Sequence, residues 1–319
     1  MMFVDKGGGA YYHGIRTFSF RGCSEGPGCR NPDRGMLKVG RLCPGPLAER
    51  QRRMKNKGGT AMSRKLIDLS IAIENGLPSD PPIMIPKITY LDHKLGAETM
   101  KLFYPGVTEK DLPGGLGWAL ELLELSTHAG THMDAPWHYH PSQDGGKPAL
   151  TIDEFPLEWA VGNGVRVDFT DKPDGYNITP DDIREKLDAM GCRLKEGDIF
   201  LAMTGADAYW GTPEYLVKGS GFGREATLWL IDQGVHVVGT DAWSWDRPLP
   251  FQAKDFERTR NPSLIWEGHF AGIEKGYFQI EKLTNLDKLP PTGFTFYCFP
   301  IKIKGASAGW IRAVAEITG

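Results

Sequence analysis

Three segments in the middle of the chain read DIFLAMTG (198–205), REATLWLIDQG (224–234) and VHVVGTDA (235–242). The first and third are short apolar runs, which are typical of buried strands. The second has the spacing of a helix and ends at Gly234, since glycine is a common helix terminator. A strand, a helix and another strand in this order predict two parallel strands joined by a crossover. We therefore expect an α/β or α+β fold.

Further elements extend this unit into a single domain from Met62 to residue 319. TPDDIREKLDAMG (179–191) predicts a helix, because Thr179 can cap it, Pro180 suits its first position and Gly191 can end it. Strands are predicted at KLIDLSIAI (65–73), WALELLEL (118–125), VGNGVRVDFT (161–170, after a turn), GFTFYCFPIKI (293–303) and GWIRAVAEI (309–317). The expected domain is a mixed sheet with flanking helices.

Residues 1–61 differ from the remainder in charge and composition. They contain 12 lysines and arginines against 4 acidic residues, a net charge of +8, which leaves −11 for residues 62–319 because the whole chain carries −3. The segment is rich in Gly, Pro and Arg without sustained periodicity, which is typical of disorder. It is either a basic arm for nucleic acid or a disordered leader that includes untranslated or vector-derived sequence. We favour the leader, because patterned sequence begins abruptly at Met62 and no basic stripe accompanies any motif.

The composition also bears on the compartment. No apolar run is long enough to span a membrane, and the first 30 residues lack the apolar segment of a secretory signal. The five cysteines show no metal-type CxxC spacing, so we expect free thiols (Cys23, Cys29, Cys43, Cys192 and Cys298). We expect a cytoplasmic protein that acts on a small molecule and binds neither nucleic acid nor a membrane.

Residues 126–140 read STHAGTHMDAPWHYH and hold four of the eight histidines in the chain. A glycine and a proline disfavour a helix here, so we expect a loop that leaves the strand predicted at 118–125. Imidazole and carboxylate are standard ligands of Zn, Mn and Fe. His128, His132 and Asp134 would leave positions open for water and substrate, as metal catalysis requires. The alternative is that these are ordinary surface or core side chains.

His138 lies four residues beyond Asp134. Pro136 should turn the chain so that the His138 ring faces the metal without joining its ligands. An imidazole close to water on a metal is suited to general base catalysis, so His138 is the predicted acid/base residue. No serine or cysteine nucleophile is needed, and the chain contains no GxSxG motif.

The segment HAGTHMDAPWH (128–138) resembles, without a gap, the HxGTHxDxPxH signature of the cyclase family of metal-dependent hydrolases. Bacterial kynurenine formamidase and isatin hydrolase belong to that family. The similarity extends more loosely from about Leu66 to Ile317. It covers VVGTDAWSWD (237–246), EKLTNLDKLP (281–290) and GASAGWIRAVA (305–315).

This resemblance implies a swivelling β/β/α-type fold, assembly into dimers or tetramers, and hydrolysis of a C–N bond in an amide, lactam or formamide. It also implies that His128, His132 and Asp134 bind a metal and that His138 acts as the acid/base.

Some formamidases of the family use a second metal, held by the shared aspartate, a later histidine and a glutamate twelve residues after that histidine. His269 and Glu281 have this separation, with Asp134 as the bridging carboxylate. Two simpler roles stay open: Glu281 as a carboxylate at a helix start, and His269 as an ordinary buried imidazole. The expected cofactor is Zn or Mn, with one or two ions per subunit.

Trp243 and Trp245 stand where the formamidases have small residues, and Trp137 and Trp210 add two more aromatic side chains. Each alone is most often a core or interface residue, but together on predicted loops they suggest an aromatic wall for a flat or apolar substrate. Nine tryptophans in one chain also suggest an interface, with loop 207–215 or 241–251 of one subunit closing the site of another. We expect a homodimer or homotetramer.

The residues predict a metal site with His138 as the acid/base, and the resemblance implies that this site hydrolyses a C–N bond. Hydrolysis of an ester or lactone, or a cyclisation by the reverse condensation, stays open on the same scaffold. A non-catalytic metal-binding protein is a further alternative, although a pure binder has no need of a positioned base.

Overall fold

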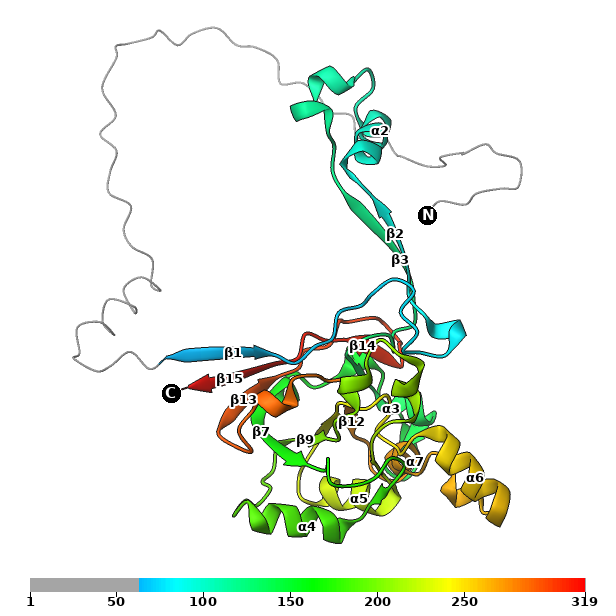
Figure 1. Ribbon diagram of the computed structural model, residues 1–319, viewed down its shortest axis with the longest axis vertical. Helices are drawn as coiled ribbons and strands as arrows, with labels where there is room; N and C mark the ends of the chain where they lie inside the picture. Colours follow the sequence, from blue (N-terminus) through cyan, green and yellow to red (C-terminus); the bar gives the residue numbers. More distant parts are fainter. Residues whose placement is uncertain (1–62, 319) are drawn as a thin grey trace, which may run out of the picture. The chain divides into compact units, whose positions relative to one another are not determined.

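A nine-stranded mixed sheet forms the centre of the protein in the computed structural model, which describes residues 63–318 (Figure 1). The strand order is β1-β15-β13-β7-β9-β11-β12-β4-β14. The bounds are β1 Arg64–Asp68, β4 His132–Asp134, β7 Val161–Asp168, β9 Ile199–Met203, β11 Val237–Thr240, β12 Phe278–Glu281, β13 Phe294–Tyr297, β14 Ala308–Trp310 and β15 Val314–Thr318. Strands β7, β9, β11 and β12 run parallel, and the outer strands pair antiparallel.

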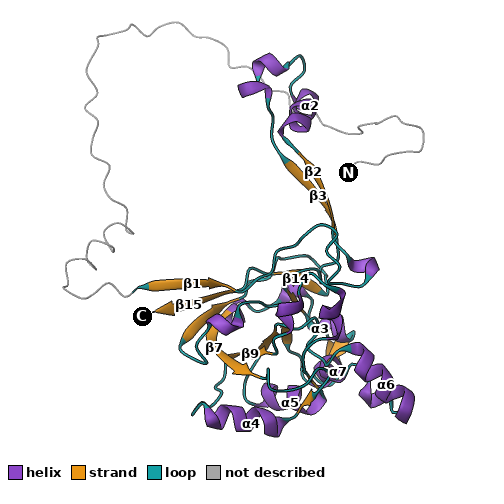
Figure 2. Cartoon of the chain, in the orientation of Figure 1, coloured by secondary structure: helices purple, strands orange, loops and turns teal. Residues whose placement is uncertain are grey.

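Helices and three small strand pairs accompany this sheet (Figure 2). The α-helices are α2 His93–Phe103, α3 Pro136–Tyr139, α4 Pro180–Ala189, α5 Arg224–Asp232, α6 Leu249–Thr259 and α7 Glu267–Glu274. The pairs are β2 Lys87–Leu91 with β3 Leu120–Glu124, β5 Ser142–Gln143 with β6 Lys147–Pro148, and β8 Asn177–Ile178 with β10 Gly221–Phe222. Within residues 63–318, no helix combines the length and the apolar character needed to cross a membrane.

The predicted crossover is confirmed. Strands β9 and β11 are parallel neighbours, with Ile199 opposite Val237, and α5 lies between them in the sequence. Successive residues of β9 face opposite sides of the sheet: Leu201 belongs to one apolar core and Phe200 to another, which α4 and α5 cover. Burial of both faces explains the continuous apolar runs. The mixed α/β fold with flanking helices is the predicted one.

Helix α4 begins as predicted. The Thr179 side chain accepts the backbone N–H of Asp182 at 3.2 Å, and the Asp182 carboxylate accepts the backbone N–H of Thr179 at 2.9 Å. This reciprocal capping box satisfies two N–H groups that a helix start leaves unpaired. Pro180 occupies the first turn, and Gly191 beyond the helix has a φ of 61°. The start and end of this helix are therefore encoded locally.

Four predicted strands differ in extent from those observed. The strand predicted at 293–303 is limited to β13, Phe294–Tyr297. The strand predicted at 65–73 ends at Asp68, and β7 takes in the expected turn at its start. The segment 309–317 forms two strands instead of one, because β14 pairs with β4 while β15 pairs with β13. Only residues 311–313 separate β14 from β15, so the two ends of the sheet must approach each other. The sheet is therefore strongly curled.

Strand β3 exists where a strand was predicted, but its surroundings differ. It pairs only with β2, and this hairpin, with α2 in its connection, projects away from the main sheet (Figure 1). All five residues of β3 are exposed, although three of them are leucines. We call residues 87–124 the arm. The high content of apolar residues thus predicted the strand correctly, but it did not predict that the strand is exposed.

The chain divides into two units, residues 1–61 and 62–319. The predictions for residues 1–61, including the disordered leader and three of the cysteines, lie outside the described residues. Within the described part, Cys192 and Cys298 are free thiols, as expected.

Candidate active site

Strand β4 carries two predicted metal ligands into the middle of the protein. It pairs antiparallel with β12, so that His132 lies opposite Glu281 and Asp134 lies opposite Gln279. Alternate residues of a strand share a face, so these four side chains meet on one face of the sheet. The prediction of a loop is wrong for His132 and Asp134. A partner strand far along the chain, which local sequence does not reveal, makes this segment a strand.

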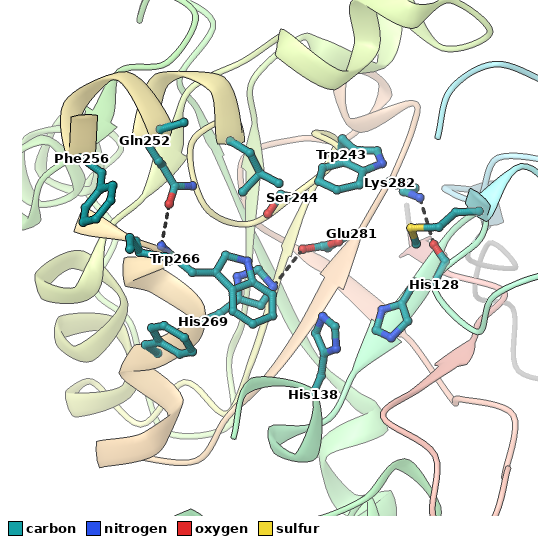
Figure 3. A pocket seen from close by; sticks show the side chains of 15 residues that line it. His128, His138, Trp243, Ser244, Gln252, Phe256, Trp266, His269, Glu281 and Lys282 are labelled. Atoms are coloured by element: carbon teal, nitrogen blue, oxygen red, sulfur yellow. Dashed lines mark hydrogen bonds and ion pairs between the residues drawn. The ribbon is translucent and has the colours of Figure 1, made fainter. Parts of the chain in front are cut away.

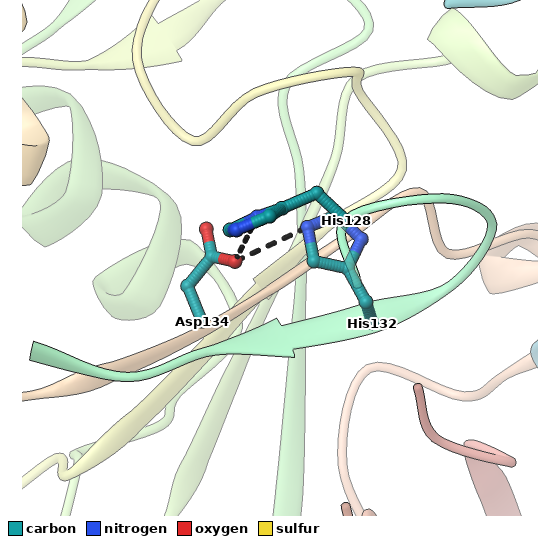
Figure 4. A group of neighbouring side chains, drawn as sticks. All are labelled: His128, His132 and Asp134. Carbon is teal, nitrogen blue, oxygen red and sulfur yellow. Dashed lines mark ion pairs between the residues drawn. The ribbon is translucent and has the colours of Figure 1, made fainter. Parts of the chain in front are cut away.

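His128, His132 and Asp134 converge at this point (Figure 4). Oδ1 of Asp134 lies 2.8 Å from Nδ1 of His128 and 3.2 Å from Nε2 of His132. The other ring nitrogen of His132 donates to the carbonyl of Gly130 at 2.9 Å, so Nε2 presents its lone pair. Gly130 has a φ of 65°, and a side chain there would collide with Ile73. The turn at Gly130 therefore fixes the tautomer of His132.

The atoms that face this point fit a divalent metal ion. Nε2 of His132 and Oδ1 of Asp134 are buried, and although Oδ1 lies close to both rings, neither atom makes a well-aligned hydrogen bond. An unsatisfied buried polar atom costs about 1–3 kcal/mol unless a ligand compensates it. Burial lowers the pKa of His132. Burial alone would raise the pKa of Asp134, but the His128 and His138 imidazoles hold it well below its usual range. Neutral imidazole and ionised carboxylate are the forms that bind metals.

His138 stands beside these ligands on the short helix α3. Its Nε2 lies 4.0 Å from Oδ2 of Asp134, and its ring centroid lies 4.1 Å from that of His128. Burial lowers the pKa of His138 to about 3, so the ring is neutral near pH 7 and can accept a proton. His138 also forms, with Asp134 and His269, a second group whose atoms are close enough to share an ion.

Helix α7 supplies His269, whose orientation is set by Asp246. At the start of the helix, Asp246 accepts the backbone N–H groups of Gly268 at 2.8 Å and of His269 at 3.0 Å. Its Oδ2 also lies 2.5 Å from Nδ1 of His269, which places the proton on Nδ1. Nε2 therefore faces Asp134 and Glu281, at 3.8 and 3.6 Å.

Glu281 ends strand β12 and does not start a helix, so that alternative is excluded. Burial and the neighbouring Asp134 carboxylate raise the pKa of Glu281 well above its usual range. Its Oε2 also lies 3.6 Å from Nε2 of His132. Glu281 thus stands between the two groups of ligands.

Lys282 follows Glu281 and is buried in a left-handed conformation, with a φ of 61°. Its ammonium pairs with Asp80 and donates to the carbonyl of His128 at 2.9 Å. Asp80 also accepts the indole N–H of Trp243 at 2.9 Å. One buried ion pair therefore connects the turn that carries His128 to a tryptophan beside it.

A cavity of about 540 Å³ opens onto the histidines (Figure 3). Several of its polar lining residues, including His138 and Glu281, lie together, whereas Gln252 lies beside Phe256 on another part of the wall. The lining consists of Met84, His128, His138, Trp243, Ser244, Leu249, Gln252, Ala253, Phe256, Ile265, Trp266, His269, Phe270, Glu281 and Lys282. Apolar walls with a few convergent polar groups are typical of small-molecule sites.

The four tryptophans predicted to contact substrate lie in different surroundings. Trp243 lines the cavity. Trp245 is fully buried and stacks on a phenylalanine, and Trp210 packs on a tyrosine. Trp137 is 45% exposed and is not among the lining residues. Trp266, which the sequence analysis missed, lines the cavity and stacks on His269 with 4.0 Å between ring centroids.

Two other residues were missed, and only one had a signal in the sequence. Gln279 precedes Glu281 by two positions, and the two-residue period of a strand places both on one face. Asp80 lies in a turn-rich segment, and nothing local indicates that it reaches Lys282.

The family model named "Cyclase" matches residues 67–247, which include His128, His132, Asp134 and His138. This match covers more than half of the chain. The chain belongs to the cyclase family.

Relatives and solved structures agree with this assignment. The chain is 30% identical to the kynurenine formamidase of Salinibacter ruber over 194 residues, which cover 60% of this chain and 77% of that one. Isatin hydrolase A from Labrenzia aggregata, solved with benzyl benzoate, is similar with a TM-score of 0.64 and 22% identity, covering 85% of this chain and 100% of that chain. An isatin hydrolase solved with the product analogue thioisatinate is similar with a TM-score of 0.63 and 20% identity. The match covers 87% of this chain and 100% of that chain. At these identities the two structures support the fold.

Proposed function

We propose that the protein hydrolyses the C–N bond of an aromatic amide, lactam or formamide. Membership of the cyclase family and the similarity to kynurenine formamidases support hydrolysis of C–N bonds other than peptide bonds, and the group of His128, His132 and Asp134 supports metal dependence. The main support for this proposal is the pair of buried atoms on His132 and Asp134 that lack a well-aligned hydrogen bond. They lie beside His138, whose ring is neutral near pH 7 and lines a largely apolar cavity.

His128, His132 and Asp134 would hold the ion, and Zn and Mn both accept such ligands. Bound there, a divalent ion lowers the pKa of water and polarises a carbonyl oxygen. His138 is placed to take the proton of the attacking water and pass it to the leaving nitrogen. The amide and one water then become a carboxylic acid and an amine. His269 and Glu281 are proposed to hold a second ion, with Asp134 shared between the two.

The aromatic substrate class rests on the walls of the cavity. Trp243, Phe256, Trp266 and Phe270 line the same cavity as His138. Flat rings gain from stacking and burial against such walls. Benzyl benzoate and thioisatinate, the ligands of the two isatin hydrolase structures, both contain a benzene ring. We therefore favour a substrate in which the reacting carbonyl is attached to or near an aromatic ring.

The purified protein, loaded with Mn²⁺ or Zn²⁺, is expected to hydrolyse isatin or N-formylkynurenine. Its kcat/KM for these should exceed that for an aliphatic lactam such as 2-pyrrolidone at least ~10-fold, because an apolar wall contributes about 1.5–3 kcal/mol per buried ring. Product formation is followed by liquid chromatography. Turnover of phenyl acetate without any turnover of amides, lactams or formamides would contradict the proposal and favour the ester or lactone alternative.

Replacing Phe256 with alanine serves as the internal test of the aromatic wall. Phe256 lines the cavity on helix α6 and makes no hydrogen bond to the histidines. KM for the aromatic substrate should rise about tenfold with kcat nearly unchanged. Tyr209→Ala is the control, because Tyr209 is an exposed aromatic residue outside the lining. Equal effects of both variants would exclude a specific role of Phe256.

A homodimer or homotetramer remains part of the proposal, with the arm as the element that joins subunits. Ten of the 22 large apolar side chains that are exposed in the described chain lie on residues 87–124. Because these side chains are about half exposed, their accessible apolar surface is on the order of 800 Å². A standard interface buries a similar area, ~800 Å² per partner. A two-stranded hairpin alone is marginally stable in water. A second copy of the chain, related by a two-fold axis, would cover it.

Leu122→Glu in β3 is expected to convert the assembly to monomers, since Leu122 is 57% exposed within the arm and a charge there opposes burial. Light scattering should show at least twice the chain mass for the wild type and the chain mass for the variant. Leu157→Glu, at a 66% exposed leucine outside the arm, is the control and should leave the mass unchanged. A monomeric wild type at assay concentration would overturn the assembly proposal without affecting the metal ligands.

A further inference from the structure

The loop that follows strand β11, residues 241–246, contains five side chains with a polar atom. Four of them form hydrogen bonds with other segments: Asp241 with Thr204, Trp243 with Asp80, Trp245 with Thr227, and Asp246 with His269. Ser244 is the fifth. It is only 5% exposed, yet its hydroxyl forms no hydrogen bond with any residue in the described range 63–318.

Ser244 instead lines the cavity that opens onto the histidines (Figure 3). Other polar residues of the lining already have partners within the protein. Gln252 donates to the carbonyl of Arg247 and accepts the backbone N–H of Trp266, both at 2.6 Å, and the Lys282 ammonium is paired. Because a buried hydroxyl needs a hydrogen-bond partner, that of Ser244 is available to a ligand in the cavity.

The backbone fixes where Ser244 lies relative to the candidate metal ligands. The N–H of Trp245 donates to Oε1 of Glu281 at 3.0 Å, and a single peptide unit joins that nitrogen to Ser244. Ser244 is therefore next to Glu281, whereas His138 reaches the cavity from helix α3. Two different elements thus present a hydroxyl and an imidazole to the same cavity.

We propose that Ser244 is a specificity-determining residue, and that its hydroxyl donates to a substrate oxygen on the carbon next to the reacting carbonyl. The reacting carbon of an amide has three neighbours, which are the carbonyl oxygen, the leaving nitrogen and the next atom of the acyl group. In the proposed function the oxygen faces the ion and the nitrogen faces His138. The acyl side then remains for Ser244, whose hydroxyl has one proton to donate.

The preferred substrate is then an aromatic amide or lactam with a ketone beside the reacting carbonyl. A formamide has only a hydrogen at that place and gains nothing from Ser244. A site that supplies a hydrogen bond discriminates against analogues that lack the matching group. This inference rests on the proposed function for the bond that is cleaved, and it adds the residue that selects the acyl side.

The test compares two acids that resemble the products of such a reaction. Phenylglyoxylate carries a ketone next to its carboxylate, and phenylacetate has a methylene group there. Calorimetric titration of the Mn²⁺-loaded wild type should show tighter binding of phenylglyoxylate. Ser244→Ala should weaken phenylglyoxylate about tenfold, the usual effect of one lost hydrogen bond, and should leave the Kd of phenylacetate unchanged.

Ser220→Ala is the matched control. Ser220 is also buried, at 1% exposed, and its hydroxyl also lacks a partner, but it is not among the lining residues. Both Kd values should stay at their wild-type levels in this variant. An unchanged Kd of phenylglyoxylate in Ser244→Ala, or equal weakening of both acids, would overturn the inference. Equal affinity of the wild type for the two acids would overturn it even if Ser244→Ala does not fold. A wild type that binds neither acid would instead overturn the aromatic site of the proposed function.

Discussion

Asp134→Ala is expected to lose both the bound metal and the activity. Asp134 belongs to both groups of candidate ligands, and its Oδ1, like Nε2 of His132, is buried without a well-aligned hydrogen bond. Removing the ligand removes several kcal/mol of transition-state stabilisation, so kcat/KM should fall on the order of 10⁴-fold. Metal content is measured by elemental analysis on the same samples as the hydrolysis rates.

Two controls keep this result interpretable. Asp134→Asn retains the shape and tests whether the loss is due to charge, and circular dichroism shows whether each variant is folded. Asp181→Ala removes a carboxylate that is 90% exposed at the start of α4 and should bind metal and turn over normally. Full metal occupancy in a folded Asp134→Ala would exclude Asp134 as a ligand.

His138→Ala should separate chemistry from metal binding. His138 Nε2 faces the cavity 4.0 Å from Oδ2 of Asp134, outside the first set of ligands. Loss of a general acid/base lowers kcat by about 10²–10⁴-fold while the metal is retained. Steady-state kinetics with metal analysis gives both quantities.

The neighbouring His140 provides the matched control for that variant. Its Nδ1 is within 2.9 Å of the Ser142 hydroxyl, and it does not line the cavity. His140→Ala should therefore keep kcat. Loss of the metal in His138→Ala would make His138 a ligand instead, as its proximity to Asp134 and His269 allows, and an unchanged kcat would remove it from the mechanism.

Those parts of the fold that local signals encode could be predicted from the sequence. The capping residues of α4 and the parallel pairing of β9 with β11 depend on residues that are close in sequence or on a strong connection rule. Strand β4 could not be predicted, because its three residues become a strand only through β12 and β14. The split of 309–317 into two strands likewise follows from distant partners.

The same distinction applies to the site. The spacing within residues 128–138 predicted a group of residues that the structure does bring together, because those ligands lie within one turn and one short strand. His269 and Glu281 were named from a resemblance, and the structure brings them beside Asp134. Trp266 and Lys282 reach the cavity from other elements, and no local pattern indicates this. A tryptophan in the sequence cannot by itself be assigned to core or pocket, as the buried Trp245 shows.

The most direct measurement of the central claim is a metal titration of the stripped protein. The protein is freed of ions with a chelator, and hydrolysis of an aromatic lactam or formamide is followed as Mn²⁺ or Zn²⁺ is added. If His128, His132 and Asp134 hold the catalytic ion, the stripped protein is inactive and activity returns in proportion to the ion bound at that site. Full activity in protein shown by elemental analysis to be free of metal would contradict the account.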